Sequence, residues 1–179
     1  MKSLIHLIES VVEGFGGVAR LCVLALVLLV ATNVILRYFF SIGPVNLQEL
    51  EWHLISPIAL LGLSYSMKHR ADVRVDVLYD KFSAKKQGVV DFITAVATVG
   101  IGAYICWLGL SYVDQSYQLQ EGSPNPGGLP MRYLLKAFIP LGFGLLALQG
   151  IADMLRAVLK FSEASDAAPQ ALEESGDVV

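Results

Sequence analysis

The chain has 179 residues, of which 55% are hydrophobic and 16% charged, with a net charge of -3 and a positive mean hydropathy. A soluble domain of this length cannot bury so many apolar side chains, so the composition predicts one small integral membrane domain with lipid as its solvent. No basic stripe with interleaved aromatic residues occurs, and nucleic acid is therefore not expected as a partner.

The first 17 residues place apolar side chains at helical spacing, at Leu4, Leu7, Ile8, Val11 and Val12. Two interpretations are open. The segment is either an interfacial amphipathic helix lying on the membrane, or the amphipathic start of the first span. The glycines between positions 14 and 17 favour a bend between this segment and the span.

Four apolar segments predict transmembrane helices, at about 18–40, 47–67, 89–113 and 132–155. Pro57 predicts a kink in the second of them, because proline removes a backbone donor. Glycine and alanine along the third predict close helix packing. The sequence thus indicates an all-α, four-helix membrane domain over residues 18–160.

The remaining segments are polar. Residues 68–86 contain six Lys and Arg residues among spaced apolar ones, which predicts an amphipathic arm along the cytoplasmic headgroups, between helices 2 and 3. Residues 114–130 are rich in Gly and Pro and predict an irregular connector. Residues 162–179 are acidic and predict a disordered tail whose role the sequence does not indicate.

Four spans would place both termini on one side of the membrane. Ten Lys and Arg residues fall on that side and three on the other, which predicts cytoplasmic N- and C-termini. The ten are Lys2, Arg20, Lys68, Arg70, Arg74, Lys81, Lys85, Lys86, Arg156 and Lys160, and the three are Arg37, Arg132 and Lys136.

The residues predict no enzyme, cofactor or metal site. The three histidines, His6, His53 and His69, lie near predicted helix ends, so no two could hold a haem between them. Cys22 and Cys106 are expected to act as small hydrophobes. No ionisable residue falls near the middle of a predicted span, where a transporter would hold a charged solute. The spans are therefore expected to pack and anchor rather than conduct.

Some polar residues are candidates for contact with a partner. Glu49 either pairs with a cation on a partner or is an interfacial carboxylate that reaches solvent. Asn33 and Arg37, one turn apart, either form a polar patch that binds a partner helix, or Arg37 simply snorkels outward. Trp52 is expected to be a membrane-belt or bundle residue.

Several motifs resemble a known family. They are NVILRYFF at 33–40, QEL at 48–50, Gly62 and VRVDVL at 73–78. Their order and spacing resemble the small membrane subunit, of the DctQ type, of tripartite ATP-independent periplasmic (TRAP) transporters, over roughly residues 18–150. The resemblance adds Gly62, Arg74 and Asp76 to Asn33, Arg37, Glu49 and Trp52 as family-motif or interface candidates. Family members commonly carry a histidine where this chain has Asp72, and the effect of that difference is open.

The resemblance implies a bacterial or archaeal inner-membrane complex that imports organic acids. In such a complex a periplasmic binding protein delivers substrate to a large membrane subunit, whose transport is driven by a sodium gradient. The small subunit is implied to be a scaffold in contact with lipid and with no cofactor, the sodium coupling lying in the large subunit. The resemblance does not indicate which substrate is transported, the stoichiometry of the subunits, or whether the small subunit contacts the binding protein. The alternative is an independent four-helix membrane protein, a regulator or small channel.

Overall fold

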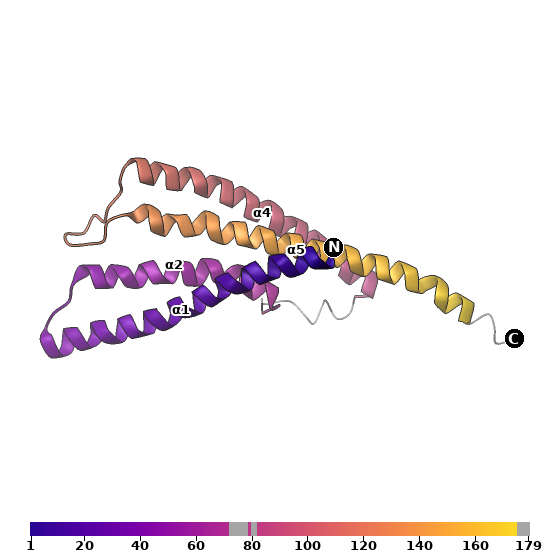
Figure 1. Cartoon of the computed structure of the whole chain (residues 1–179), viewed down its shortest axis with the longest axis horizontal. Coiled ribbons are helices and arrows are strands. Elements are labelled where there is room, and N and C mark those ends of the chain that lie inside the picture. Colours follow the sequence, from indigo (N-terminus) through magenta and orange to yellow (C-terminus); the bar gives the residue numbers. More distant parts are fainter. Residues whose placement is uncertain (72–78, 80–81, 175–179) are drawn as a thin grey trace.

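The computed structural model is all-helical, as predicted, and describes residues 1–71, 79 and 82–174. Its helices, labelled as in Figure 1, are α1 (Lys2–Phe40), α2 (Val45–Lys68), α4 (Ala84–Gln118) and α5 (Arg132–Glu174). Most of the predicted basic arm, including Arg74 and Asp76, lies outside the described residues.

Residues 2–40 form one helix, α1, so the glycines at positions 14–17 do not end it. The amphipathic first half packs against α5: Ile5, Ile8 and Val12 form a buried cluster with Ala152. Leu4 and Leu7, which the pattern placed on the apolar face, are exposed instead. The buried side chains recur at helical spacing, as predicted, but they lie on the side of α1 that faces α5 rather than on the side of Leu4 and Leu7.

A tight turn connects α1 to α2. Ser41 adopts a left-handed conformation, with φ 55°, and its backbone N–H donates to Leu36. Pro44 then caps α2, which continues through Pro57 as one helix of 24 residues. At 1.5 Å per residue α2 extends about 36 Å, enough to cross the ~30 Å hydrocarbon layer.

Both later helices are longer than their predicted spans. The polar connector was expected to begin at Asp114, but α4 continues to Gln118, whose side-chain amide donates to Asp114 at 2.7 Å. That pair one turn apart stabilises the last helical turn. α5 continues to Glu174, over residues 162–174 for which the composition predicts disorder. Alanine, glutamine, leucine and glutamate in that segment are good helix formers.

The four helices form two antiparallel hairpins, α1–α2 and α4–α5, that meet along a seam between α2 and α5 (Figure 1). We call the end with the α1–α2 and α4–α5 connections the hairpin end, and the opposite end the terminal end. At the seam, a Cβ on Gly142 would lie 2.8 Å from the backbone oxygen of Leu60. Leu61 and Leu145 are buried beside it with Ala19 of α1. The order across the layer is therefore α1, α2, α5, α4.

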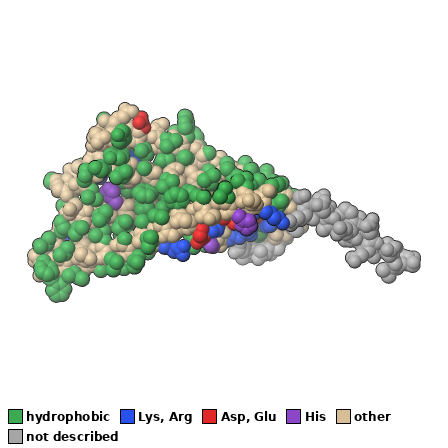
Figure 2. Space-filling view, in the orientation of Figure 1, with side chains coloured by type: hydrophobic (Ala, Val, Ile, Leu, Met, Phe, Trp, Pro, Cys, Tyr) green, Lys and Arg blue, Asp and Glu red, His purple; other side chains and the backbone are tan. Residues whose placement is uncertain are grey.

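Most of the molecular surface is apolar. Figure 2 shows hydrophobic side chains over most of the visible face, whereas most of the charged and histidine side chains there gather toward the terminal end. Within the described residues, three helical segments are long and apolar enough to cross a membrane: Lys2–Phe40, Lys86–Gln118 and Arg132–Phe161. α2 is long enough but less apolar, since its lipid-length stretch includes His53 and several serines.

Candidate functional site

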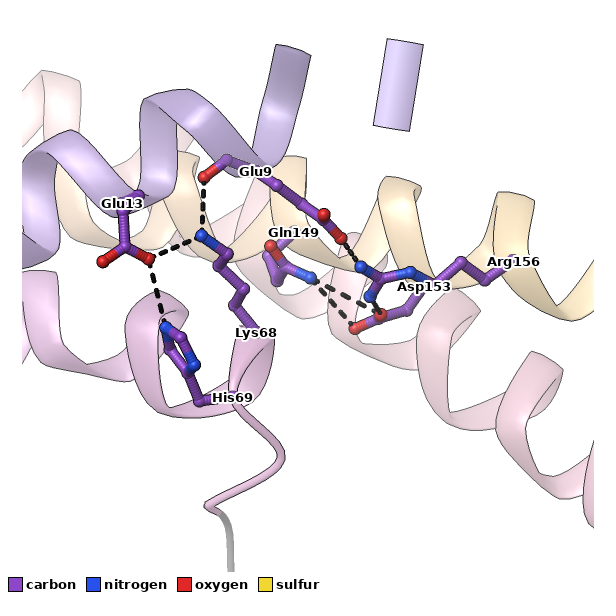
Figure 3. Close-up of polar contacts among 7 residues, drawn as sticks. All are labelled: Glu9, Glu13, Lys68, His69, Gln149, Asp153 and Arg156. Atoms are coloured by element: carbon purple, nitrogen blue, oxygen red, sulfur yellow. Dashed lines mark hydrogen bonds and ion pairs between the residues drawn. The ribbon is translucent and has the colours of Figure 1, made fainter. Parts of the chain in front are cut away.

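A network of charged side chains connects α1 to α5 at the terminal end. Glu9 of α1 forms an ion pair with Arg156 of α5, which also contacts Asp153 at 2.8 Å (Figure 3). Gln149, one turn before Asp153, is fully buried and lies 3.4 Å from both carboxylate oxygens of Asp153. Burial lowers the hydration of these groups, so each depends on its partner within the protein.

The same segment of α1 is connected to α2. The Lys68 ammonium donates to the Glu13 carboxylate at 2.5 Å and to the backbone oxygen of Glu9 at 3.1 Å. His69 places its Nε2 atom 3.1 Å from Glu13 (Figure 3). The His69 ring also lies 4.4 Å from the Tyr65 ring, centre to centre, with the two planes tilted by 47°. Glu9 and Glu13 are one turn apart on α1 and each faces a different helix. This terminal cluster therefore holds three helices together.

A second cluster, at the hairpin end, is organised around Glu49. Its carboxylate, in a residue only 4% exposed, accepts hydrogen bonds from the Ser123 hydroxyl, the Asn125 amide at 2.9 Å and the Leu129 backbone N–H at 2.7 Å. All three donors belong to the connector between α4 and α5. A Cβ on Gly128 would lie 2.7 Å from the Glu49 carboxylate, so a larger residue there would require the Glu49 and Ser123 side chains to move. Glu49 thus binds a loop of its own chain.

Glu121, a residue of the same connector, contacts both of the helices that the connector joins. It forms an ion pair with Lys136 and accepts a hydrogen bond from Ser116 at 2.6 Å. The Lys136 ammonium also lies 4.0 Å from the centre of the Tyr112 ring. The bond from Lys136, and then that from Ser116, lowers the pKa of the Glu121 carboxyl below its ordinary value of 4.5. Its contribution to stability is therefore present above pH 4.5 and is lost as the pH falls through the lowered pKa.

We expect Glu49→Ala to release the α4–α5 connector while leaving the four helices folded. The change removes the acceptor that all three donors share, and hydrogen bonds to a charged group are among the stronger ones. Trypsin cannot cut within 122–130, so the measurement is limited cleavage by a protease of broad specificity. Cleavage in the connector should accelerate by roughly tenfold or more, because cleavage follows the population of the open form.

The matched control for this experiment is Asp114→Asn. Asp114 is an exposed carboxylate at the same end of the molecule, and it accepts a hydrogen bond from Gln118 of the same helix. Its replacement should leave the cleavage rate of the connector unchanged. Equal cleavage of the Glu49→Ala protein and the unmodified chain would show that Glu49 does not hold the connector.

Asn33 and Glu51 form a third polar contact, between α1 and α2. The Asn33 amide donates to the Glu51 carboxylate at 2.9 Å, and the Asn33 oxygen is buried with no donor among the residues that the structure describes. Arg37, one turn along α1, is exposed. Asn33 thus binds the neighbouring helix of its own chain, and Arg37 makes its polar end available on the surface.

The structure separates the other predicted residues. Trp52 is 63% exposed on α2, as expected for a belt residue. Gly62 also lies on α2, where a Cβ would meet no atom within 4 Å. Glu49, considered as a solvent-facing or partner-facing carboxylate, is instead enclosed by its own loop. The described candidates do not converge on one pocket.

Sequence reasoning missed the residues of the terminal cluster. The one available signal was the spacing of Glu9 and Glu13, which places two carboxylates on one face of a helix. Asp153 falls in the last turn of the fourth predicted span, whereas α5 continues for nearly six turns beyond it. Because the partners are supplied by helices far apart in sequence, periodicity alone could not identify them.

The chain is similar to known membrane proteins over most of its length. Residues 26–160 match the family described as tripartite ATP-independent periplasmic transporters, DctQ component. The chain is 34% identical over 128 residues to a TRAP transporter small permease protein of Haemophilus influenzae, covering 71% of this chain and 76% of that protein. It is 23% identical over 108 residues to the isethionate TRAP transporter permease protein DctMQ of Oleidesulfovibrio alaskensis, covering 60% of this chain. The matched region spans only 16% of the length of that second relative.

Proposed function

Because the chain belongs to the DctQ component family of tripartite ATP-independent periplasmic transporters, we propose that it is the scaffold subunit of such a transporter. Its partners are a large membrane subunit and a periplasmic substrate-binding protein. The complex is a secondary transporter that imports an organic acid with a sodium gradient, and the large subunit carries the sodium coupling. In this role the small subunit contributes a fixed body rather than a substrate path.

The observation that supports this proposal is that the buried polar side chains bind other parts of the same chain. In the described part of the chain, the buried charges hold one helix to another, as Glu9 does with Arg156, or hold a loop, as Glu49 does. The broad faces of the helical layer are apolar. A single layer of helices that is held by polar contacts at both ends and exposes apolar side chains is expected to pack beside a larger membrane protein.

The proposed topology has four spans in the bacterial or archaeal inner membrane, with both termini in the cytoplasm. The length of α2 supports a fourth span, and its packing between α1 and α5 supports it further. The Lys and Arg asymmetry supports the orientation, which puts the terminal cluster on the cytoplasmic side and the Glu49 connector on the periplasmic side. That connector then faces the compartment of the binding protein.

The experiment that tests the proposal is purification of the tagged full chain from native membranes in mild detergent. We expect a large multispanning permease to co-purify in near-equal amount, and substrate uptake by the cells to require both proteins. The control is an unrelated tagged membrane protein of similar size, purified in the same detergent. A chain that purifies alone, folded and stable, from cells that retain uptake would instead favour an independent membrane protein.

A further inference from the structure

Glu51 is a partly buried carboxylate that lacks a cation. It accepts a hydrogen bond from the neutral amide of Asn33, and no residue that the structure describes forms an ion pair with it. Glu51 is the seventh residue of α2, and Asn33 lies seven residues before the end of α1, so the contact lies roughly 10 Å from the turn. A carboxylate at this depth, among apolar side chains, is stabilised by a positive charge.

The face of α2 beside Glu51 is exposed in the part of the chain that the structure describes. Trp52, Ile55, Ala59 and Leu63 recur at helical spacing and are all exposed. Gly62 adjoins them, and the space that its side chain would occupy is open. A glycine within a helix is destabilising by about 1 kcal/mol relative to alanine, and no contact with another described residue requires glycine at position 62. A recess beside a flat apolar stripe fits the close approach of another helix.

These two features are adjacent on one side of the layer. Glu51 lies at the border between α2 and α1, and the exposed stripe continues from it along α2 toward the terminal end. The opposite side of α2 is covered by α5, where Leu61 and Ser64 are fully buried. The open side of α2 therefore presents one negative charge near the hairpin end and a recess at Gly62, about 16 Å farther along the helix.

We propose that this surface, made of Glu51, Trp52, Ile55, Ala59, Gly62 and Leu63, receives a transmembrane helix of the large permease subunit that carries a Lys or Arg opposite Glu51. The inference rests on the proposed function and adds to it the docking face and the charge of the partner. The cation of the partner completes the Asn33–Glu51 pair, and its helix backbone fits the recess at Gly62. Charge complementarity selects this occupant, since an apolar helix or an acyl chain would leave Glu51 without a counter-charge.

The first test is site-specific photo-crosslinking in native membranes. A benzophenone amino acid at position 62 should crosslink to the large permease, and the captured peptide should come from a transmembrane helix with a Lys or Arg. The control position is 100, on α4, where Gly100 also has open space around it. Capture of lipid only or of a second copy of the chain at position 62, or stronger capture of the permease at position 100, would overturn the proposal.

The second test uses substitutions that leave the isolated fold intact. Gly62→Leu should reduce the permease recovered with the tagged chain by at least about fivefold, while Gly100→Leu should not. Glu51→Lys should reduce recovery more than Glu51→Gln, because it places two cations opposite each other. If all four variants recover the permease as the unmodified chain does, this docking face is wrong but the scaffold role stands. If the unmodified chain recovers no permease, the scaffold role itself is wrong.

Discussion

Replacing Gly142 with leucine is expected to separate α2 from α5 and to remove most of the folded protein from detergent extracts. A Cβ at this position would lie 2.7 Å from the Cβ of Leu60, 2.8 Å from its backbone oxygen and 3.0 Å from its carbonyl carbon. Backbone atoms cannot rotate out of the way as a side-chain end can. The two helices would have to move apart along the seam that joins the hairpins, and membrane helices associate mainly through such close packing.

Gly142→Ala is the sharper version of this test. In an open helical position, alanine stabilises the helix by about 1 kcal/mol relative to glycine. Here overpacking, which typically costs about 1 to 3 kcal/mol, opposes that gain. We therefore expect a lower melting temperature for Gly142→Ala, and a far lower one for Gly142→Leu, in thermal scans monitored by size-exclusion chromatography.

The matched control is Gly14→Ala in α1, where a Cβ would meet no atom within 4 Å. This variant should melt at the same temperature as the unmodified protein or above it. If Gly142→Ala behaved like Gly14→Ala, the α2–α5 seam would be looser than the distances indicate, and the hairpins would be held together chiefly by their ends.

These glycines show how much of the fold the sequence could predict. Long apolar runs predict the helices, and clusters of Gly and Pro such as the one at 122–130 predict the loops between them. They do not predict which helix packs on which. Gly100 and Gly142 lie in similar apolar surroundings in the sequence, yet one has open space and the other touches the backbone of α2. That difference arises from the order of helices across the layer, which no single segment encodes.

For the candidate site too, the sequence indicated some of the residues but not the partners that they contact. Glu49 was predicted either to pair with a cation on a partner or to reach solvent at the interface, and the structure shows it bonded to a loop of its own chain. Its partners were missed because Ser123, Asn125 and Leu129 are more than 70 residues away and their loop has no periodicity. The first turns of α1 were predicted as an amphipathic segment, and Ile5, Ile8 and Val12 are buried there. Their packing on α5 could not be predicted from periodicity, because it depends on a helix more than 130 residues later.

Arg156→Met is expected to lower the free energy of unfolding by about 2 to 3 kcal/mol. Removing one partner of a buried ion pair typically costs about 3 to 5 kcal/mol, because the other charge is left without compensation. The Arg156 side chain is 30% exposed, so water recovers part of that loss. The change leaves two carboxylates, Glu9 and Asp153, without the guanidinium that both contact, and it should free the first turns of α1 from α5.

The control for this prediction is Lys160→Met, one turn farther along α5. Lys160 forms an ion pair with Asp91 at 3.7 Å, but its side chain is 56% exposed, so this replacement should change the stability little. The double variant Glu9→Gln with Arg156→Met then tests the mechanism. If the destabilisation arises from the uncompensated carboxylate, neutralising Glu9 should restore a measurable part of the stability in a double-mutant cycle. If the double variant is less stable than Arg156→Met alone, Arg156 instead acts through the packing of its aliphatic part, and the ion pair is not what fastens α1 to α5.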